Sequence, residues 1–227
     1  VRQEPLPINP FLPQESDNGG IVIKENSNAI AKRIAGLFDS VYNIGDQQYS
    51  VLHRAIMDSV ETMKSGMNLD HMLEIIESMT GEKQYKASAQ SLYNKLRPFV
   101  LEQPFSSGEI GFDWDHLFLD QDPLCNIFQL AGMDMYSGRL ITEFILWDLY
   151  GHLQSNGKKT DPKVIVLDEV QNLDHKEGSP LSKYLREGRK FGLSLILATQ
   201  TMSNMKKDER DRMFNAAHKL FFRPADT

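Results

Sequence analysis

VIVLDE, at residues 164–169, places four consecutive apolar residues directly before two adjacent carboxylates, Asp168 and Glu169. An unbroken apolar run of this length is typical of a strand that is buried on both faces in a parallel sheet. In open parallel sheets, ligands bind near the carboxyl ends of the strands, and both carboxylates directly follow such an end. The segment therefore predicts an α/β fold with a candidate site at the strand end, although a strand that simply ends in an acidic turn gives the same pattern.

A second apolar run, residues 193–198, ends in Thr199 and Gln200. If the two strands are neighbours, Gln200 lies beside Asp168 and Glu169, where its amide can hydrogen-bond an attacking water or a terminal phosphate. We therefore take Gln200 as a candidate sensor of the phosphate. A glutamine that only caps the strand or meets solvent is the alternative.

Patterns around these two strands predict further elements of a parallel sheet. A helix at residues 181–190 joins the strands, a helix at 208–217 follows, and the apolar segment 219–223 is a candidate third strand. Upstream, residues 125–130 read as a strand, and apolar residues between 140 and 153 predict a long helix. This βαβ succession predicts right-handed crossover connections.

Two arginines, Arg186 and Arg189, lie in the connection between the two apolar runs. Because they are three positions apart, a helix would place them on one face. An arginine at a subunit boundary can neutralise charge on a transferring phosphoryl group. Both are therefore candidate catalytic residues, with surface salt bridges on a helix as the alternative.

The first 103 residues have a different character from the rest of the chain. Residues 1–26 are rich in Pro, Asn and Gly, which predicts an extended segment or linker. Apolar residues at helical spacing predict four helices in residues 27–103, the first of them capped by Ser27 or Asn28. We expect a helical subdomain there and the α/β part in residues 104–227.

Composition limits the classes of function that the chain can have. The chain has 227 residues, a net charge of -6 and no apolar run long enough to span a membrane. A single cysteine, Cys125, cannot form an internal disulfide and fits a reducing cytoplasm, and the scattered histidines form no zinc pattern. An acidic chain can contact nucleic acid only through local basic clusters. Three clusters are candidates: Lys158 with Lys159, residues 186–190, and Lys206 and Lys207 with Arg210 and Arg212. Each can equally be a solvent-exposed face with no binding role.

VIVLDEVQNL at residues 164–173 and LREGRKFGLSLILATQ at residues 185–200 resemble the HerA/FtsK superfamily of hexameric DNA-pumping ATPases. The resemblance is specific over residues 163–200 and looser from residue 9 to residue 128. Within the superfamily, the pattern is most similar to the HerA-like component of phosphorothioation-dependent restriction systems. The resemblance implies an incomplete RecA-like sheet flanked by helices, a homohexamer with ATP bound between subunits, and double-stranded DNA in a central channel.

The site roles follow the pattern of P-loop ATPases. The first acid after such a Walker B strand helps to hold Mg²⁺ through its water shell, and the second can polarise the attacking water. We assign these roles to Asp168 and Glu169, with Gln200 as sensor and Arg186 or Arg189 acting on the phosphoryl group. ATP and Mg²⁺ are the expected cofactors, and restriction-complex proteins are candidate partners.

One motif of a complete motor is absent from the sequence. No strand is followed by G-x-x-x-x-G-K-[ST], the loop that cradles the phosphates, and the nearest string, residues 151–160, has the wrong spacing and context. We expect the loop to lie upstream in a longer protein and this chain alone to be inactive. Two alternatives are an ATPase that moves protein or single-stranded DNA in conjugation or secretion, and an interaction module on a silent RecA-like scaffold.

Overall fold

The computed structural model divides into two compact units, Val1–Asn156 and Gly157–Thr227, which are described separately. The residues that the structure describes are 5–17, 20–63, 66–106, 111–119, 125–130, 132–203, 205–214 and 218–222. This division falls at a different place from the boundary expected near residue 103, because the long helix α6 belongs to the first unit. That the helical segment is an insertion in a motor domain stays a prediction.

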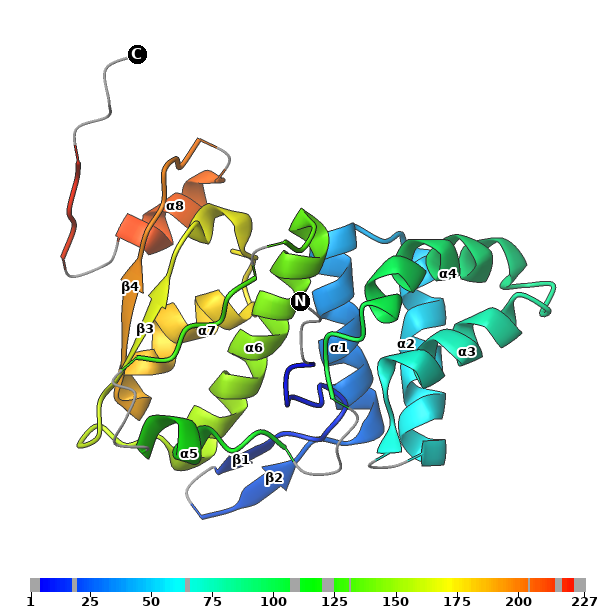
Figure 1. Ribbon diagram of the computed structural model, residues 1–227, viewed down its shortest axis with the longest axis horizontal. Helices are drawn as coiled ribbons and strands as arrows, with labels where there is room; N and C mark the ends of the chain where they lie inside the picture. Colours follow the sequence, from blue (N-terminus) through cyan, green and yellow to red (C-terminus); the bar gives the residue numbers. More distant parts are fainter. Residues whose placement is uncertain are drawn as a thin grey trace. The chain divides into compact units, whose positions relative to one another are not determined.

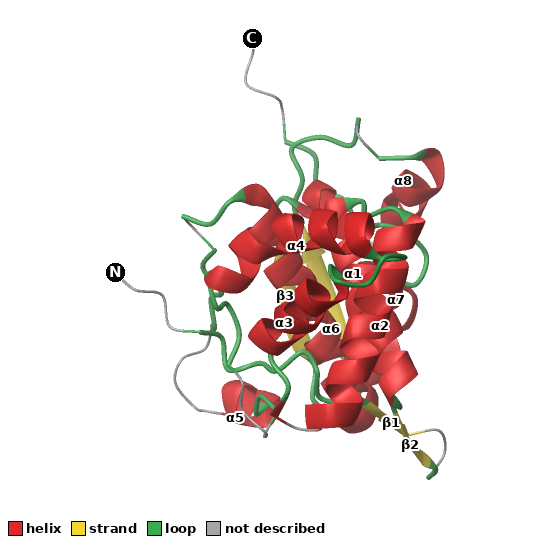
Figure 2. Cartoon of the chain, turned by 90° about the vertical axis from the view of Figure 1, so that its right-hand side faces the viewer, coloured by secondary structure: helices red, strands yellow, loops and turns green. Residues whose placement is uncertain are grey.

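The first unit is mainly helical (Figures 1 and 2). Its helices are α1 (Ser27–Tyr42), α2 (Asp46–Met63), α3 (Leu69–Met79), α4 (Lys86–Leu101), α5 (Trp114–Leu119) and α6 (Met135–Asn156). They confirm the helical spacing seen in the sequence, since most of the buried residues of α1 to α4 are apolar. No helix among the described residues is long and apolar enough to cross a membrane.

The core of this unit is centred on a group of phenylalanines from different helices. Phe38 of α1 lies edge-on to Phe99 of α4 and to Phe144 of α6, with 5.9 Å between ring centroids in each pair. Phe105 packs edge-on to Phe144 at 5.2 Å. Edge-to-face pairs each add about 0.5–1.5 kcal/mol beyond the burial of their area. The cluster therefore joins α1, α4 and α6 into one packed body.

The N-terminal segment, expected to be extended or a linker, packs against this core. Ile8 and Phe11 are 1% and 2% exposed, and the backbone of Leu6 pairs with Pro104 and Ser106. Further along, β1 (Glu15–Asp17) and β2 (Val22–Lys24) form an antiparallel hairpin. Part of the expected linker is therefore a folded segment that buries Ile8 and Phe11, whereas the apolar side chains of Ile21, Val22 and Ile23 are exposed.

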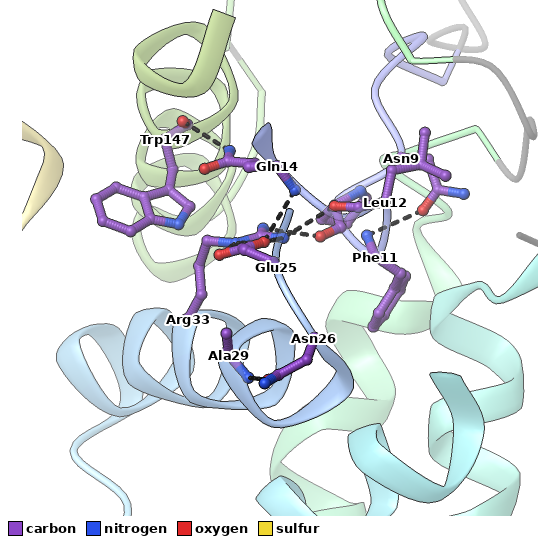
Figure 3. Close-up of polar contacts among 10 residues, drawn as sticks. Asn9, Phe11, Leu12, Gln14, Glu25, Asn26, Ala29, Arg33 and Trp147 are labelled. Carbon is purple, nitrogen blue, oxygen red and sulfur yellow. Dashed lines mark hydrogen bonds and ion pairs between the residues drawn. The ribbon is translucent and has the colours of Figure 1, made fainter. Parts of the chain in front are cut away.

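A buried arginine of α1 holds the segment in place (Figure 3). The guanidinium of Arg33 pairs with the carboxylate of Glu25, with 2.8 Å between Nη2 and Oε2, and donates to the carbonyls of Pro10 and Leu12 at 2.9 and 3.0 Å. A buried charge is tolerated only when such partners replace its water. Asn26, rather than Ser27 or Asn28, caps α1, because its Oδ1 accepts from the N–H of Ala29 at 2.9 Å.

The second unit contains the predicted pair of parallel strands (Figure 1). β3 (Lys163–Leu167) pairs in parallel with β4 (Leu193–Leu197), with Lys163 opposite Leu193 and Leu167 opposite Leu197. The connection holds the 3₁₀ turn η2 (Val170–Asn172), helix α7 (Pro180–Glu187) and the 3₁₀ turn η3 (Gly188–Phe191), and α8 (Lys207–Phe214) follows β4. The βαβ order expected from the sequence is confirmed for these elements.

Three expectations about the strands differ from the structure. Residues 125–130 and 218–222 form no strand, because neither segment pairs with a described strand and most of their side chains are exposed. Residues 215–217 and 223, the ends of the expected last helix and third strand, lie outside the described residues. Burial on both faces of β3 and β4 is also contradicted, since Val164, Val166 and Ile196 are 57%, 64% and 55% exposed.

Candidate functional site

The carboxyl ends of β3 and β4 bring the predicted acids and Gln200 to one place. The ladder continues beyond the strands, because the N–H of Ala198 donates to Leu167 O at 2.8 Å and the N–H of Val170 donates to Ala198 O at 3.0 Å. These two bonds fix the residues that follow each strand against one another. Glu169 and Gln200 therefore lie side by side, as expected from neighbouring strands.

The backbone of Glu169 has an unusual conformation. Its φ is 52° and its ψ is 41°, in the left-handed region, where the Cβ of a residue other than glycine costs about 1 kcal/mol or more. The following residue, Val170, is fully buried, and its N–H bond to β4 fixes the turn. Strained residues of this kind persist where the surrounding structure requires them, and they cluster at functional sites. The conformation turns the side chain of Glu169 toward the end of β4.

Both carboxylate oxygens of Glu169 accept hydrogen bonds from side-chain amides. Nε2 of Gln200 donates to Oε1, and Nε2 of Gln171 donates to Oε2. Oε1 of Gln171 in turn accepts from the hydroxyl of Thr199 at 2.6 Å. A continuous hydrogen-bonded network therefore links the two strand ends through Glu169. Its donors are neutral, so the carboxylate is oriented without an ion pair.

Gln171 and Thr199 are members of the site that sequence reasoning missed. A signal was available, because Gln171 follows Glu169 by two positions and Thr199 directly precedes Gln200. The 3₁₀ turn η2 folds Gln171 back beside Glu169, and a strand-end motif alone does not reveal such a turn.

Asp168 has a different environment from Glu169. Its side chain is exposed, and its Oδ1 accepts from the N–H of Glu169 at 2.9 Å. Among the described residues, no group of three or more His, Cys, Asp or Glu side chains is placed to hold a metal ion. One exposed carboxylate fits Mg²⁺, which keeps several of its waters and takes one or two protein ligands together with phosphate oxygens.

The two candidate arginines lie on separate elements rather than on one helix. Arg186 is on α7 and forms ion pairs with Glu177 at 3.7 Å and Glu187 at 3.2 Å. Arg189 is exposed in η3, after α7 has ended at Glu187. Within the described part of the chain, no hydrogen bond or ion pair joins either arginine to Asp168, Glu169 or Gln200. Their expected role in catalysis stays a prediction.

A buried histidine links the turn after Glu169 to α8. His175 is 7% exposed, and its Nε2 lies 2.8 Å from Val170 O. Nη2 of Arg212, on α8, donates to the carbonyl of His175. The turn that carries Glu169 is thus fixed by β4 on one side and by the 175 segment on the other.

No protein-family model matches the chain, which is similar to a curated protein in sequence and to a solved structure in fold. The DNA double-strand break repair helicase HerA of Sulfurisphaera tokodaii is 22% identical over 206 residues, which are 79% of this chain and 40% of that protein. The chain thus spans less than half the length of this curated relative. VirB4 of Thermoanaerobacter pseudethanolicus has a TM-score of 0.55 at 15% identity, over 90% of this chain and 73% of the VirB4 chain.

These comparisons bear on the fold and on the superfamily. The likeness to VirB4 shows a shared mixed α/β fold, which agrees with a partial RecA-like sheet. Together with the similarity to HerA, it supports the HerA/FtsK-type ATPase superfamily that the motifs resembled. It does not distinguish the narrower likeness to a restriction component.

Proposed function

We propose that this chain carries the strand-end part of an ATP-hydrolysing site in a longer DNA motor. The observation that carries the proposal is the pairing of Glu169 with Gln200 across the ends of two parallel strands. The similarity to HerA and to VirB4 supports an ATPase of this general class. ATP and Mg²⁺ are its cofactors, and residues upstream of this chain supply the phosphate-binding loop.

In the proposed site, Asp168 and Glu169 have different roles, one in binding Mg²⁺ and one in activating water. Asp168 helps to hold Mg²⁺ through water, because its carboxylate is exposed at the strand end. Glu169 accepts the proton of the attacking water, a role that a general base fills only when one of its oxygens is available. Arg186 or Arg189 acts on the phosphoryl group across a boundary between subunits.

Gln200 couples the state of the nucleotide to Glu169. In the structure, its amide occupies Oε1 of Glu169, so that oxygen has a neutral donor in the place of water. The Glu169 carboxylate and the terminal phosphate of ATP are both ionised acceptors, and the phosphate carries the larger negative charge and more acceptor oxygens. Gln200 therefore turns to the phosphate when ATP binds, which frees Oε1 for the attacking water.

The substrate of the motor is double-stranded DNA, and the intact protein is a cytoplasmic homohexamer that acts in DNA restriction or processing. The name of the HerA relative, a DNA repair helicase, favours DNA. Transport of protein or single-stranded DNA in conjugation or secretion is the second candidate. A silent scaffold is disfavoured, because it would not need the hydrogen-bonded network around Glu169.

The test is the ATPase rate of the longer protein with and without duplex DNA. We expect hydrolysis that duplex DNA stimulates and that an equal mass of single-stranded DNA stimulates less. Stimulation by single-stranded DNA alone would favour the conjugation candidate. Absence of hydrolysis under both conditions would contradict the proposed enzyme.

A further inference from the structure

The basic clusters of the second unit differ in how much of their positive charge is balanced by nearby acidic residues. Around α8, Lys206, Lys207, Arg210 and Arg212 alternate with Asp208, Glu209 and Asp211. Arg212 pairs with Asp208 at 3.6 Å, and Arg186 is paired with Glu177 and Glu187. In residues 206–212, three acids offset four cations, and Arg186 is offset by its two ion pairs, so the net positive charge around these residues is small.

Lys158, Lys159, Arg189 and Lys190 are also exposed, and no ion pair joins any of them to an acid among the described residues. They differ from the cations near α8 in having fewer acids beside them in their own segments. The nearby Asp161 pairs with Lys163. Residues 158–163 and 188–192 together hold five cations and one acid, in a chain whose net charge is -6. The excess of positive charge in these two segments is therefore local and uncompensated.

The fold brings the two segments together at the amino ends of the strands. The N–H of Lys163 donates to Gly192 O at 3.0 Å, at the start of the β3–β4 ladder. Gly192 has a φ of 79°, and a Cβ on it would lie 2.3 Å from Lys158 O, so glycine is required for this approach. Lysines 158 and 159 are thus held against the turn that carries Arg189 and Lys190, although about 30 residues separate them in sequence.

We propose that this basic edge, formed by Lys158, Lys159, Arg189 and Lys190, contacts the phosphate backbone of nucleic acid. Clustered Lys and Arg bind phosphates by releasing condensed counterions, and the fork of an arginine suits phosphate oxygens. A membrane surface fits less well, because none of the large exposed apolar side chains of the described residues lies in either segment. The choice of nucleic acid as the polyanion rests on the proposed function.

The basic edge and the candidate ATPase site lie at opposite ends of the same strands. Five residues of strand, at about 3.3 Å each, separate them by roughly 16 Å. A contact at the basic edge therefore leaves Asp168, Glu169 and Gln200 free for nucleotide, and it leaves the action on the phosphoryl group to Arg186.

The test is binding of this chain to a fluorescently labelled duplex of random sequence, followed by anisotropy over a range of salt concentrations. Lys158→Gln with Lys159→Gln removes two cations from one segment, and Arg189→Gln with Lys190→Gln removes two from the other. Lys206→Gln with Lys207→Gln removes the same charge from the start of α8 and serves as the matched control. Circular dichroism melting checks that each variant is folded.

We expect each edge variant to weaken binding on the order of tenfold per lost contact at about 50 mM salt, and to reduce the slope of log K against log[salt] by about 1 per contact. The control should change both quantities much less. An equal loss in the control, no loss in the edge variants, or no binding to duplex at all would overturn the proposal. So would loss of binding to anionic vesicles, with DNA binding retained, in the edge variants.

This outcome is separable from the proposed ATPase function. Binding needs only this chain and no nucleotide, whereas hydrolysis is measured in the longer protein. A motor without hydrolysis but with an edge-dependent DNA contact would refute the proposed function alone. Hydrolysis that Glu169→Gln abolishes, together with DNA binding insensitive to the edge variants, would refute the basic edge alone.

Discussion

The helical unit and the strand unit of this chain differ in how completely they bury their apolar side chains. In the first unit, the rings of Phe38, Phe99 and Phe144 are almost fully buried and the buried Arg33 is fully paired. In the second, Val164 and Val166 of β3 are more than half exposed, while polar groups meet at the strand ends. The packed core is therefore concentrated in the helices of the first unit, whereas the candidate chemistry lies at the end of a sheet with an exposed face.

The largest expected effect is the loss of a ring from the core of the first unit. Phe38→Ala should lower the free energy of unfolding by about 3–5 kcal/mol, because it removes buried apolar area and leaves a cavity among packed rings. Both tryptophans, Trp114 and Trp147, belong to this unit, so their fluorescence in urea reports its unfolding. The matched control is Val166→Thr on the exposed face of β3, which should change stability by less than about 0.5 kcal/mol. An equal loss of unfolding free energy in the two variants would contradict the difference in burial between the two units.

The second effect concerns the ion pair that holds the N-terminal segment. Arg33→Met should cost about 3 kcal/mol, because it leaves Glu25 without its partner and the carbonyls of Pro10 and Leu12 without donors. Lys24→Met breaks the exposed pair with Glu15 and should cost less than about 0.5 kcal/mol. Urea titrations of the two variants are compared directly. If Arg33→Met is as mild as Lys24→Met, the segment is not anchored through this pair.

The third effect tests positioning at the strand ends. In the longer protein, Gln171→Ala should lower kcat roughly tenfold with little change in KM, because Glu169 loses one of its two orienting donors. Asn172→Ala, at the next and exposed position, is the control and should leave kcat near the wild-type value. Thr199→Ser keeps the hydroxyl that donates to Gln171 and should also retain activity. A rise in KM alone would mean that Gln171 binds substrate instead.

The smallest effect is a dependence of stability on pH in the first unit. Burial raises the pKa of the Asp148 carboxyl, although the hydrogen bond from Trp114 opposes the shift. A folded-state pKa above the unfolded value means that the stabilisation is present at acidic pH and is lost as the pH rises through the folded pKa. Asp148→Asn should therefore stabilise the protein at pH 7 and lose this advantage below about pH 4, the unfolded value. Thermal melting of the wild type and the variant, at pH 7 and below about pH 4, measures the difference in stability between them. The same difference at both pH values would exclude Asp148 as the cause of the pH dependence.

The sequence predicted the helices and strands whose apolar pattern lies within the element itself. Helical spacing located α1 to α4, and the two apolar runs located β3 and β4, because each pattern repeats within one element. The neighbouring positions of Glu169 and Gln200 also followed from the sequence, since parallel strands align their carboxyl ends.

Contacts between distant segments could not be predicted in this way. The packing of the N-terminal segment against the helices was not predicted, because Arg33, within a helix, supplies partners for carbonyls more than 20 positions upstream. The strand expected at residues 125–130 was wrong because apolar composition does not reveal whether a pairing partner exists. Gln171 was missed because its place in the network depends on the left-handed turn at Glu169.

The most direct measurement is the ATPase turnover of the longer protein with Glu169→Gln, an isosteric change that retains the side chain's shape. If Glu169 is the general base, kcat should fall by about 10²- to 10⁴-fold while the affinity for ATP stays near that of the wild type. Circular dichroism should show an unchanged fold. Hydrolysis at the wild-type rate would contradict the account, because the two strand ends would then hold a structural network and no catalytic site.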